Sequence, residues 1–126
     1  MAKGSATIGR DRYRTEILVG GHGIVADEPP ALGGQGAGPA PYDLLLASLG
    51  ACTAITLRMY ADRKEWPLES LEVALRLYGQ DERRIDRTLT ISGLDEAQKA
   101  RLADVAERTP VTLTLKSGLP IDTHLA

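Results

Sequence analysis

The chain of 126 residues has the length of one domain, and its 43% hydrophobic and 25% charged residues are typical of a folded globular protein. Its net charge of −2, with arginines scattered among acids, argues against nucleic-acid binding. No apolar run approaches the ~20 residues that cross a bilayer, and the first residues lack a signal peptide's apolar core. The single cysteine, Cys52, excludes an intramolecular disulfide and a zinc cluster of several thiolates. We therefore expect one domain over residues 1–126, in the cytoplasm and away from membranes.

The N-terminal third predicts a small antiparallel sheet. Apolar and polar residues alternate over residues 13–19, which is typical of a strand with one covered face. The pair Gly20-Gly21 then predicts a tight hairpin leading into a second strand over residues 22–26. A further strand is expected at residues 5–9.

A glycine-rich segment, Gly33–Gly38, lies inside a predicted loop over residues 28–41. Glycine-rich loops before helices can cradle phosphate. This one lacks the Lys-Ser/Thr of a Walker loop and the glycine spacing of a dinucleotide fingerprint. Pro39 and Pro41 also remove two amide donors. We interpret the segment as a flexible connector.

The next segment predicts a long helix from Tyr42 to about Lys64. Pro41 suits its first turn, and no proline interrupts it before Pro67. The helix is apolar nearly all round as far as Arg58. Such a helix is normally buried, either inside its domain or against a second chain.

Two alternating segments, residues 71–78 and 85–92, predict a pair of strands, each with one exposed face. Asp95 and Gln98 form a capping-box pattern that opens a second helix. That helix is expected to end before Pro110. The order of strands and helices indicates an α+β domain.

Two further strands are suggested after Pro110. Val111, Leu113 and Leu115 alternate with polar residues, and so do the apolar residues of segment 119–125.

Cys52 is the one soft nucleophile of the chain, and two interpretations stay open. Free cysteine is among the most buried residue types and usually acts as a small hydrophobe. A reactive cysteine needs access to substrate and a nearby cation or helix N-terminus. Cys52 lies some three turns into the predicted helix, too far from its start for the dipole to help. An arginine from elsewhere would have to stabilise a thiolate here.

Other polar groups give weaker signals. His22 and His124 share no ligand spacing with Cys52, so we expect neither a metal nor a cofactor. The adjacent acids Asp27 and Glu28 lie in an apparent turn, where a solvated position is expected.

Three segments carry a family resemblance: residues 38–53 (GPAPYDLLLASLGACT), 56–61 (TLRMYA) and 63–68 (RKEWPL). They resemble the OsmC/Ohr family, named for osmotically inducible protein C and the organic hydroperoxide resistance proteins. The resemblance covers nearly the whole chain. It implies an α+β fold with antiparallel sheets around a long buried central helix, two chains intertwined as a homodimer, and active sites at the subunit interface. It also implies a helix over residues 110–115, which we prefer to the strand.

The resemblance also implies chemistry. In the family's peroxidases a thiolate at the position of Cys52 attacks an organic hydroperoxide, and a second cysteine closes a disulfide that external thiols reduce. An arginine and a glutamate hold the thiolate and the peroxide. Arg10 best matches the arginine, and Asp43 is the carboxylate nearest to the glutamate position, which Tyr42 occupies.

This chain departs from the pattern at Thr109, which stands where the second cysteine is expected, before Pro110-Val111. A sulfenic acid on Cys52 would then need an external thiol as reductant. Two hypotheses follow. The first is a one-cysteine peroxidase for bulky organic hydroperoxides in oxidative stress defence. The second is a non-catalytic dimer of the same fold that binds a small hydrophobic ligand.

Overall fold

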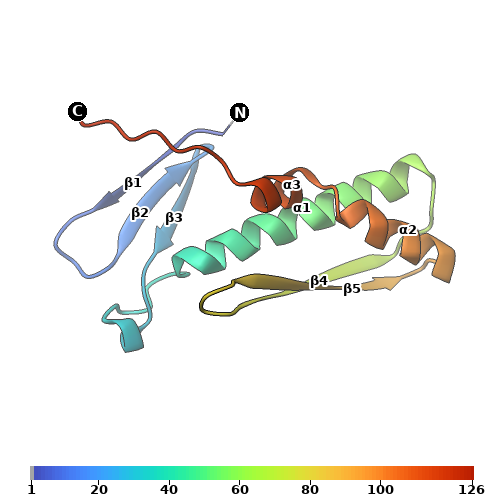
Figure 1. The fold of residues 1–126 in the computed structure, drawn as a ribbon, viewed down its shortest axis with the longest axis horizontal. Helices are drawn as coiled ribbons and strands as arrows, with labels where there is room; N and C mark the ends of the chain where they lie inside the picture. Colours follow the sequence, from blue (N-terminus) through green and yellow to red (C-terminus); the bar gives the residue numbers. More distant parts are fainter. Residues whose placement is uncertain (1) are drawn as a thin grey trace. The chain divides into compact units, whose positions relative to one another are not determined.

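The computed structural model describes residues 2–126, so Met1, the first residue of the predicted domain, lies outside the described part. The chain divides into two compact units, residues 1–45 and 46–126. Its elements follow in the order β1 (Gly4–Ile8), β2 (Thr15–Val19), β3 (His22–Ala26), the 3-10 helix η1 (Pro30–Leu32), α1 (Pro41–Arg63), β4 (Ser70–Tyr78), β5 (Arg84–Ser92), α2 (Glu96–Ala106) and α3 (Pro110–Ser117) (Figure 1). Helices and antiparallel sheets confirm the predicted α+β class.

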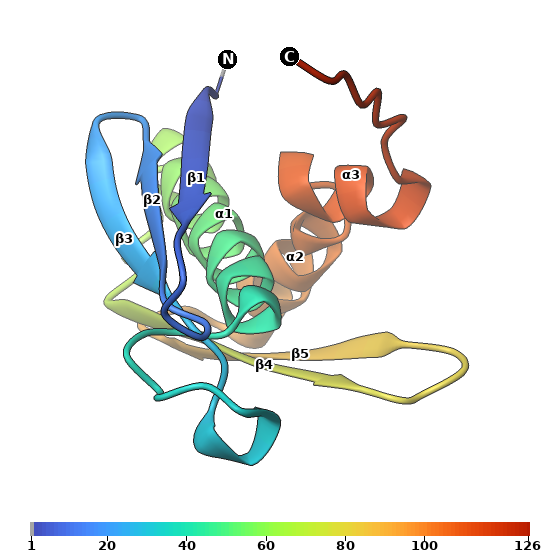
Figure 2. The ribbon, with the colours of Figure 1, turned by 90° about the vertical axis from the view of Figure 1, so that its left-hand side faces the viewer.

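The first unit is built on a three-stranded antiparallel sheet in the order β1-β2-β3 (Figure 2). Val19 pairs with His22 across the predicted two-residue turn. Gly20 and Gly21 have φ angles of 59° and 82°, and a hairpin turn of this kind needs positive φ at both positions. The expected strand near residues 5–9 is confirmed as β1.

A buried carboxylate, Asp27, organises the loop that follows β3. Its Oδ1 accepts from the backbone N–H groups of Tyr13 at 2.9 Å and Glu28 at 2.7 Å. Its Oδ2 accepts from those of Gln35 at 3.3 Å and Ala37 at 3.1 Å. The solvated position expected for Asp27 is wrong, since the residue is 3% exposed. The glycine-rich segment is likewise held by these bonds and is no free connector.

Acid should loosen this loop before it affects the rest of the fold. The N–H of Ala37, followed by those of Tyr13 and Glu28, holds the pKa of Asp27 below its ordinary value. Because the folded-state pKa is depressed, the stabilisation is fully present above about pH 4 and is lost as the pH falls through the folded-state pKa. We expect Asp27→Asn to lower the Tm at pH 7, and the difference from wild type to shrink on acidification below about pH 4. Thermal unfolding at several pH values measures this.

The matched control is Asp81→Asn, in the turn between β4 and β5, where the acid is exposed. Its Tm difference from wild type should be small at every pH. A constant deficit of Asp27→Asn down to about pH 3 would contradict the assignment.

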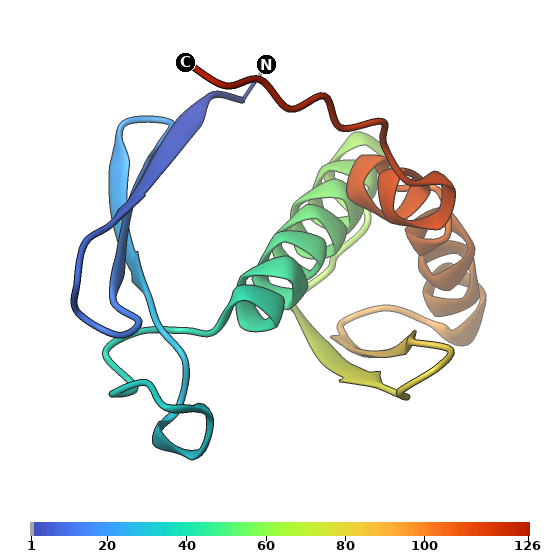
Figure 3. The same ribbon diagram turned by 60° about the vertical axis from the view of Figure 1, so that its left-hand side comes forward.

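The second unit packs α1 and α2 on one face of the β4–β5 hairpin (Figure 3). Its buried centre consists of Leu57 from α1 with Leu102 and Ala106 from α2. Partly buried residues of both strands and of the α1–β4 connection surround it, among them Trp66, Leu71, Leu89 and Ile91. The predicted capping box is confirmed: Asp95 accepts from the N–H of Gln98, and the Gln98 side chain accepts from the N–H of Asp95.

Helix α1 is buried along one stripe, formed by Leu49, Thr53, Leu57 and Ala61. Its other side is exposed, with Ile55 at 55% and Met59 at 53%. We expected the whole helix to be buried, inside its domain or against a second chain. A single chain buries only one of its faces.

By length and composition alone the same helix could cross a membrane, which corrects the expectation that no apolar run is long enough. Core helices of soluble proteins can have the same length and composition. The buried stripe of α1 lies in the centre of the second unit, which is the position of a core helix.

The segment after Pro110 is helix α3, as the family resemblance implies, and the strand suggested by alternation is wrong. Proline suits the first turn of a helix, and Thr112 is the residue that α3 buries. The strand expected at residues 119–125 is also wrong. Leu119, Ile121 and Leu125 are exposed there, and the segment pairs with no strand among the described residues.

Candidate functional site

Cys52 lies in the middle of α1, in the second unit, and is partly buried. Its Sγ is 4.0 Å from Oγ1 of Thr56, one helical turn further along. The sulfur thus contacts a neutral hydroxyl on its own helix. The residue is only partly buried, and a nucleophile must be accessible to its substrate.

Arg10 and Asp43 belong to the first unit, and each is described there by itself. Arg10 is exposed in the bend after β1. Asp43 lies in the first turn of α1, where its Oδ2 accepts from the backbone N–H of Ala40 at 3.0 Å. This is the reciprocal half of a capping box, so the carboxylate has a structural role at the start of the helix.

Thr109 is the N-cap residue directly before α3 and is 1% exposed. Its hydroxyl lies 2.6 Å from that of Thr112, so the position expected for a second thiol holds a buried, hydrogen-bonded hydroxyl. Thr112 also faces the side chain of Arg87, which extends the contact to strand β5.

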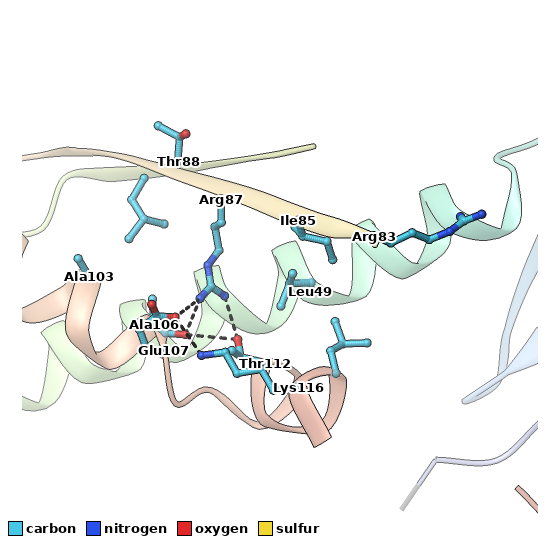
Figure 4. A pocket seen from close by; sticks show the side chains of 12 residues that line it. Leu49, Arg83, Ile85, Arg87, Thr88, Ala103, Ala106, Glu107, Thr112 and Lys116 are labelled. Atoms are coloured by element: carbon cyan, nitrogen blue, oxygen red, sulfur yellow. Dashed lines mark hydrogen bonds and ion pairs between the residues drawn. The ribbon is translucent and has the colours of Figure 1, made fainter. Parts of the chain in front are cut away.

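The side chain of Arg87, on β5, contacts α1, α3 and the C-terminal end of α2, and Figure 4 draws its contacts with the last two. Its Nη1 donates to the hydroxyls of Thr53 on α1 at 3.0 Å and Thr112 on α3 at 2.8 Å. Its Nη2 donates to the carbonyl of Ala106 at 2.8 Å and lies 3.4 Å from Oε2 of Glu107. Thr53 directly follows Cys52, so this buried network fixes the part of α1 that carries the cysteine.

Sequence reasoning missed Arg87, although a signal was present. In β5 the residues at positions 85, 87, 89 and 91 are turned inward. A charged residue at one inward position of an otherwise apolar series indicates a buried polar partner.

A groove of about 710 Å³ opens beside the Arg87 guanidinium (Figure 4). Both apolar and charged side chains line it: Leu49, Arg83, Ile85, Arg87, Thr88, Leu89, Ala103, Ala106, Glu107, Thr112, Leu115 and Lys116. Its size is that of a small-molecule site. Among residues 2–126 no group of three or more histidine, cysteine or acidic side chains is placed to hold a metal.

Solved structures with the same fold come from several bacteria. An OsmC-like protein from Mycoplasma pneumoniae is 20% identical with a TM-score of 0.79, over 92% of this chain and 87% of that one. An organic hydroperoxide resistance protein OsmC from Legionella pneumophila is 22% identical with a TM-score of 0.70, over 92% and 89%. The organic hydroperoxide resistance protein OhrB of Bacillus subtilis is 24% identical with a TM-score of 0.62, over 90% of each chain. These likenesses establish the fold.

The family follows from the sequence itself. No curated protein matches the chain. The profile of the family described as OsmC-like protein matches residues 34–124, a range that includes Cys52, the Arg87 network and Thr109. The chain therefore belongs to the OsmC-like protein family.

Proposed function

We propose that this protein reduces organic hydroperoxides through Cys52, with a thiol as the electron donor, in defence against oxidative stress. Membership of the OsmC-like family supports this proposal, as do structural neighbours named for organic hydroperoxide resistance. The observation that carries it is a partly buried Cys52 on α1, within the segment that resembles the family's peroxidases.

The reaction balances with one cysteine. The Cys52 thiolate attacks the peroxide ROOH, the O–O bond breaks, and ROH leaves after taking up a proton, which leaves Cys52 as a sulfenic acid. An external thiol then displaces water from the sulfur and forms a mixed disulfide. A second thiol attacks that disulfide, returns Cys52 to the thiol and carries the electrons away as an oxidised disulfide. Thr109 has no thiol to take part.

Two further residues have proposed roles in this reaction. Arg10 supplies the guanidinium that stabilises the thiolate, in the position that the family resemblance implies. Asp43 is the nearest match to the family's carboxylate, although its Oδ2 is engaged at the helix start. Exchange of each residue for a neutral one should lower the rate of Cys52 oxidation.

The active form is proposed to be a homodimer in the cytoplasm. Ile55 and Met59 are exposed on α1, and large apolar side chains that share one helix face are typically covered by another protein surface. A second copy of the chain is the partner that the family resemblance implies.

Intact-mass measurement tests the proposal directly. Treatment with substoichiometric cumene hydroperoxide should add one oxygen to the protein, and an added thiol such as 2-mercaptoethanol should convert this species into a mixed disulfide. Prior alkylation of the native protein with iodoacetamide should block both products. A native protein that neither reacts with iodoacetamide nor gains oxygen would overturn the proposal.

The second candidate is a dimer of the same fold without redox chemistry, which binds a small hydrophobic ligand. The buried hydroxyl of Thr109, firmly bonded to Thr112, favours it, because the site of a redox partner has become structural. An inert Cys52 in the mass experiment would remove the first candidate and leave this one.

A further inference from the structure

The groove beside Arg87 is lined by both aliphatic and charged side chains. Leu49, Ile85 and Leu115 contribute aliphatic surface from α1, β5 and α3. Arg83, Arg87 and Lys116 contribute positive charge, and Glu107 is the one acid of the lining. Apolar walls with a few convergent charged groups are typical of a site for a small amphipathic molecule.

Glu107 lies between the two cations at long distances. Its Oε2 is 3.4 Å from Nη2 of Arg87 and 3.3 Å from Nζ of Lys116. Arg101 and Arg108, by contrast, each reach Asp104 at 2.8 Å, the usual length of a charge-assisted bond. Glu107 is also 60% exposed. Its carboxylate is therefore held weakly and can be displaced at little cost.

The other bonds of Arg87 are of a different kind. Thr53, Thr112 and the carbonyl of Ala106 are buried or nearly so, and loss of the guanidinium would leave them without this donor. Arg87 is 13% exposed and fixed in place by these three bonds. The guanidinium is thus a rigid cation whose one replaceable partner is a carboxylate.

We propose that this groove binds an amphipathic monocarboxylate, a hydrocarbon chain that ends in one carboxylate. The ligand's carboxylate takes the place of Glu107 between Arg87 and Lys116. Its chain lies on Leu49, Ile85 and Leu115. The site lies within the second unit and does not involve the sulfur of Cys52, so it is independent of the proposed peroxide chemistry.

The charges of the groove favour a carboxylate over an amine or an alcohol with the same hydrocarbon chain. With Glu107 displaced, Arg87 and Lys116 present two positive charges to one carboxylate, and the planar guanidinium matches carboxylate geometry. An alkylamine would meet the like charges of Arg83, Arg87 and Lys116. An alcohol would bury the same chain without the ionic contact, and so would bind more weakly.

Ligand titration followed by NMR of backbone amides tests the proposal, with three probes of equal chain length: octanoate, octanol and octylamine. Octanoate should shift amides of β5 and α3 with a Kd about fivefold lower than that of octanol, while octylamine should not bind. Lys116→Met should raise the octanoate Kd about fivefold and leave octanol unchanged. Glu107→Gln should lower the octanoate Kd, because it removes the competing carboxylate.

Two control variants accompany these measurements. Lys64→Met removes the same charge from the residue directly after α1, outside the groove lining, and should leave all three Kd values unchanged. Cys52→Ser should bind octanoate like wild type, so that failure of the peroxidase proposal and failure of this one are separate results.

Three outcomes would overturn the inference. One is equal affinity for octanoate and octanol, which makes the groove an apolar surface only. Another is an unchanged octanoate Kd in Glu107→Gln. The third is that octanoate leaves the chemical shifts of the groove amides unchanged, while protein concentration changes them. That result would identify the groove as an interface between copies of the chain.

Discussion

Cys52→Ser should abolish thiol-dependent consumption of cumene hydroperoxide. Serine keeps the shape of the side chain, but its hydroxyl stays protonated at neutral pH and cannot form the sulfenic acid on which the cycle depends. Loss of a sole nucleophile typically lowers turnover on the order of 10,000-fold, to the background rate of peroxide with thiol. The decline of peroxide in the presence of a dithiol, followed for both proteins, measures this.

The matched control is Thr56→Val, which removes the hydroxyl that lies 4.0 Å from the sulfur and leaves the sulfur in place. This variant should keep turnover within about tenfold of wild type, because a neutral hydroxyl at that distance makes at most a weak contact with sulfur. Equal rates for Cys52→Ser and wild type would remove the catalytic interpretation, and the fold alone would remain.

The largest loss of stability is expected for Arg87→Met. Methionine fills much of the same apolar space but leaves Thr53, Thr112 and the carbonyl of Ala106 without their shared donor. Breaking a largely buried charged network in this way costs about 3 kcal/mol of unfolding free energy. Urea unfolding followed by the fluorescence of Trp66, which packs against the core of the second unit, measures it.

Two companion variants sharpen this result. Arg76→Met removes an exposed ion pair with Asp86 on the same hairpin and should change stability by less than about 0.5 kcal/mol. Arg87→Lys keeps the charge but loses the fork that reaches several acceptors, and should fall between wild type and Arg87→Met. A loss for Arg87→Met as small as that for Arg76→Met would show that the network contributes nothing.

Much of the fold could be predicted because the signals are local. The hairpin at Gly20-Gly21 follows from two residues that tolerate positive φ, and the capping box follows from the spacing of Asp95 and Gln98. Helix α1 follows from a long apolar segment without proline. Alternation alone failed after Pro110, because apolar residues at every second position over a short segment fit one turn of a helix as well as a strand.

The site was less predictable, because its contacts join residues far apart in the chain. Asp27 becomes a buried centre only when the loop folds back and brings the amides of Gln35 and Ala37 to it. The charges of the groove likewise come from the turn before β5, from β5 itself, from the end of α2 and from α3. The spacing of residues in the sequence does not predict which distant donors and acceptors form hydrogen bonds in the folded protein.

By itself the sequence determined the α+β class, the positions of most helices and strands, the family and the presence of a single cysteine, since each depends on neighbouring residues, on composition or on a continuous motif. Only the tertiary structure decided that Thr109 is a buried structural hydroxyl and that Arg87 joins α1, α2 and α3. The physical reason is that burial and hydrogen bonding depend on which segments pack together, and packing is a property of the whole fold.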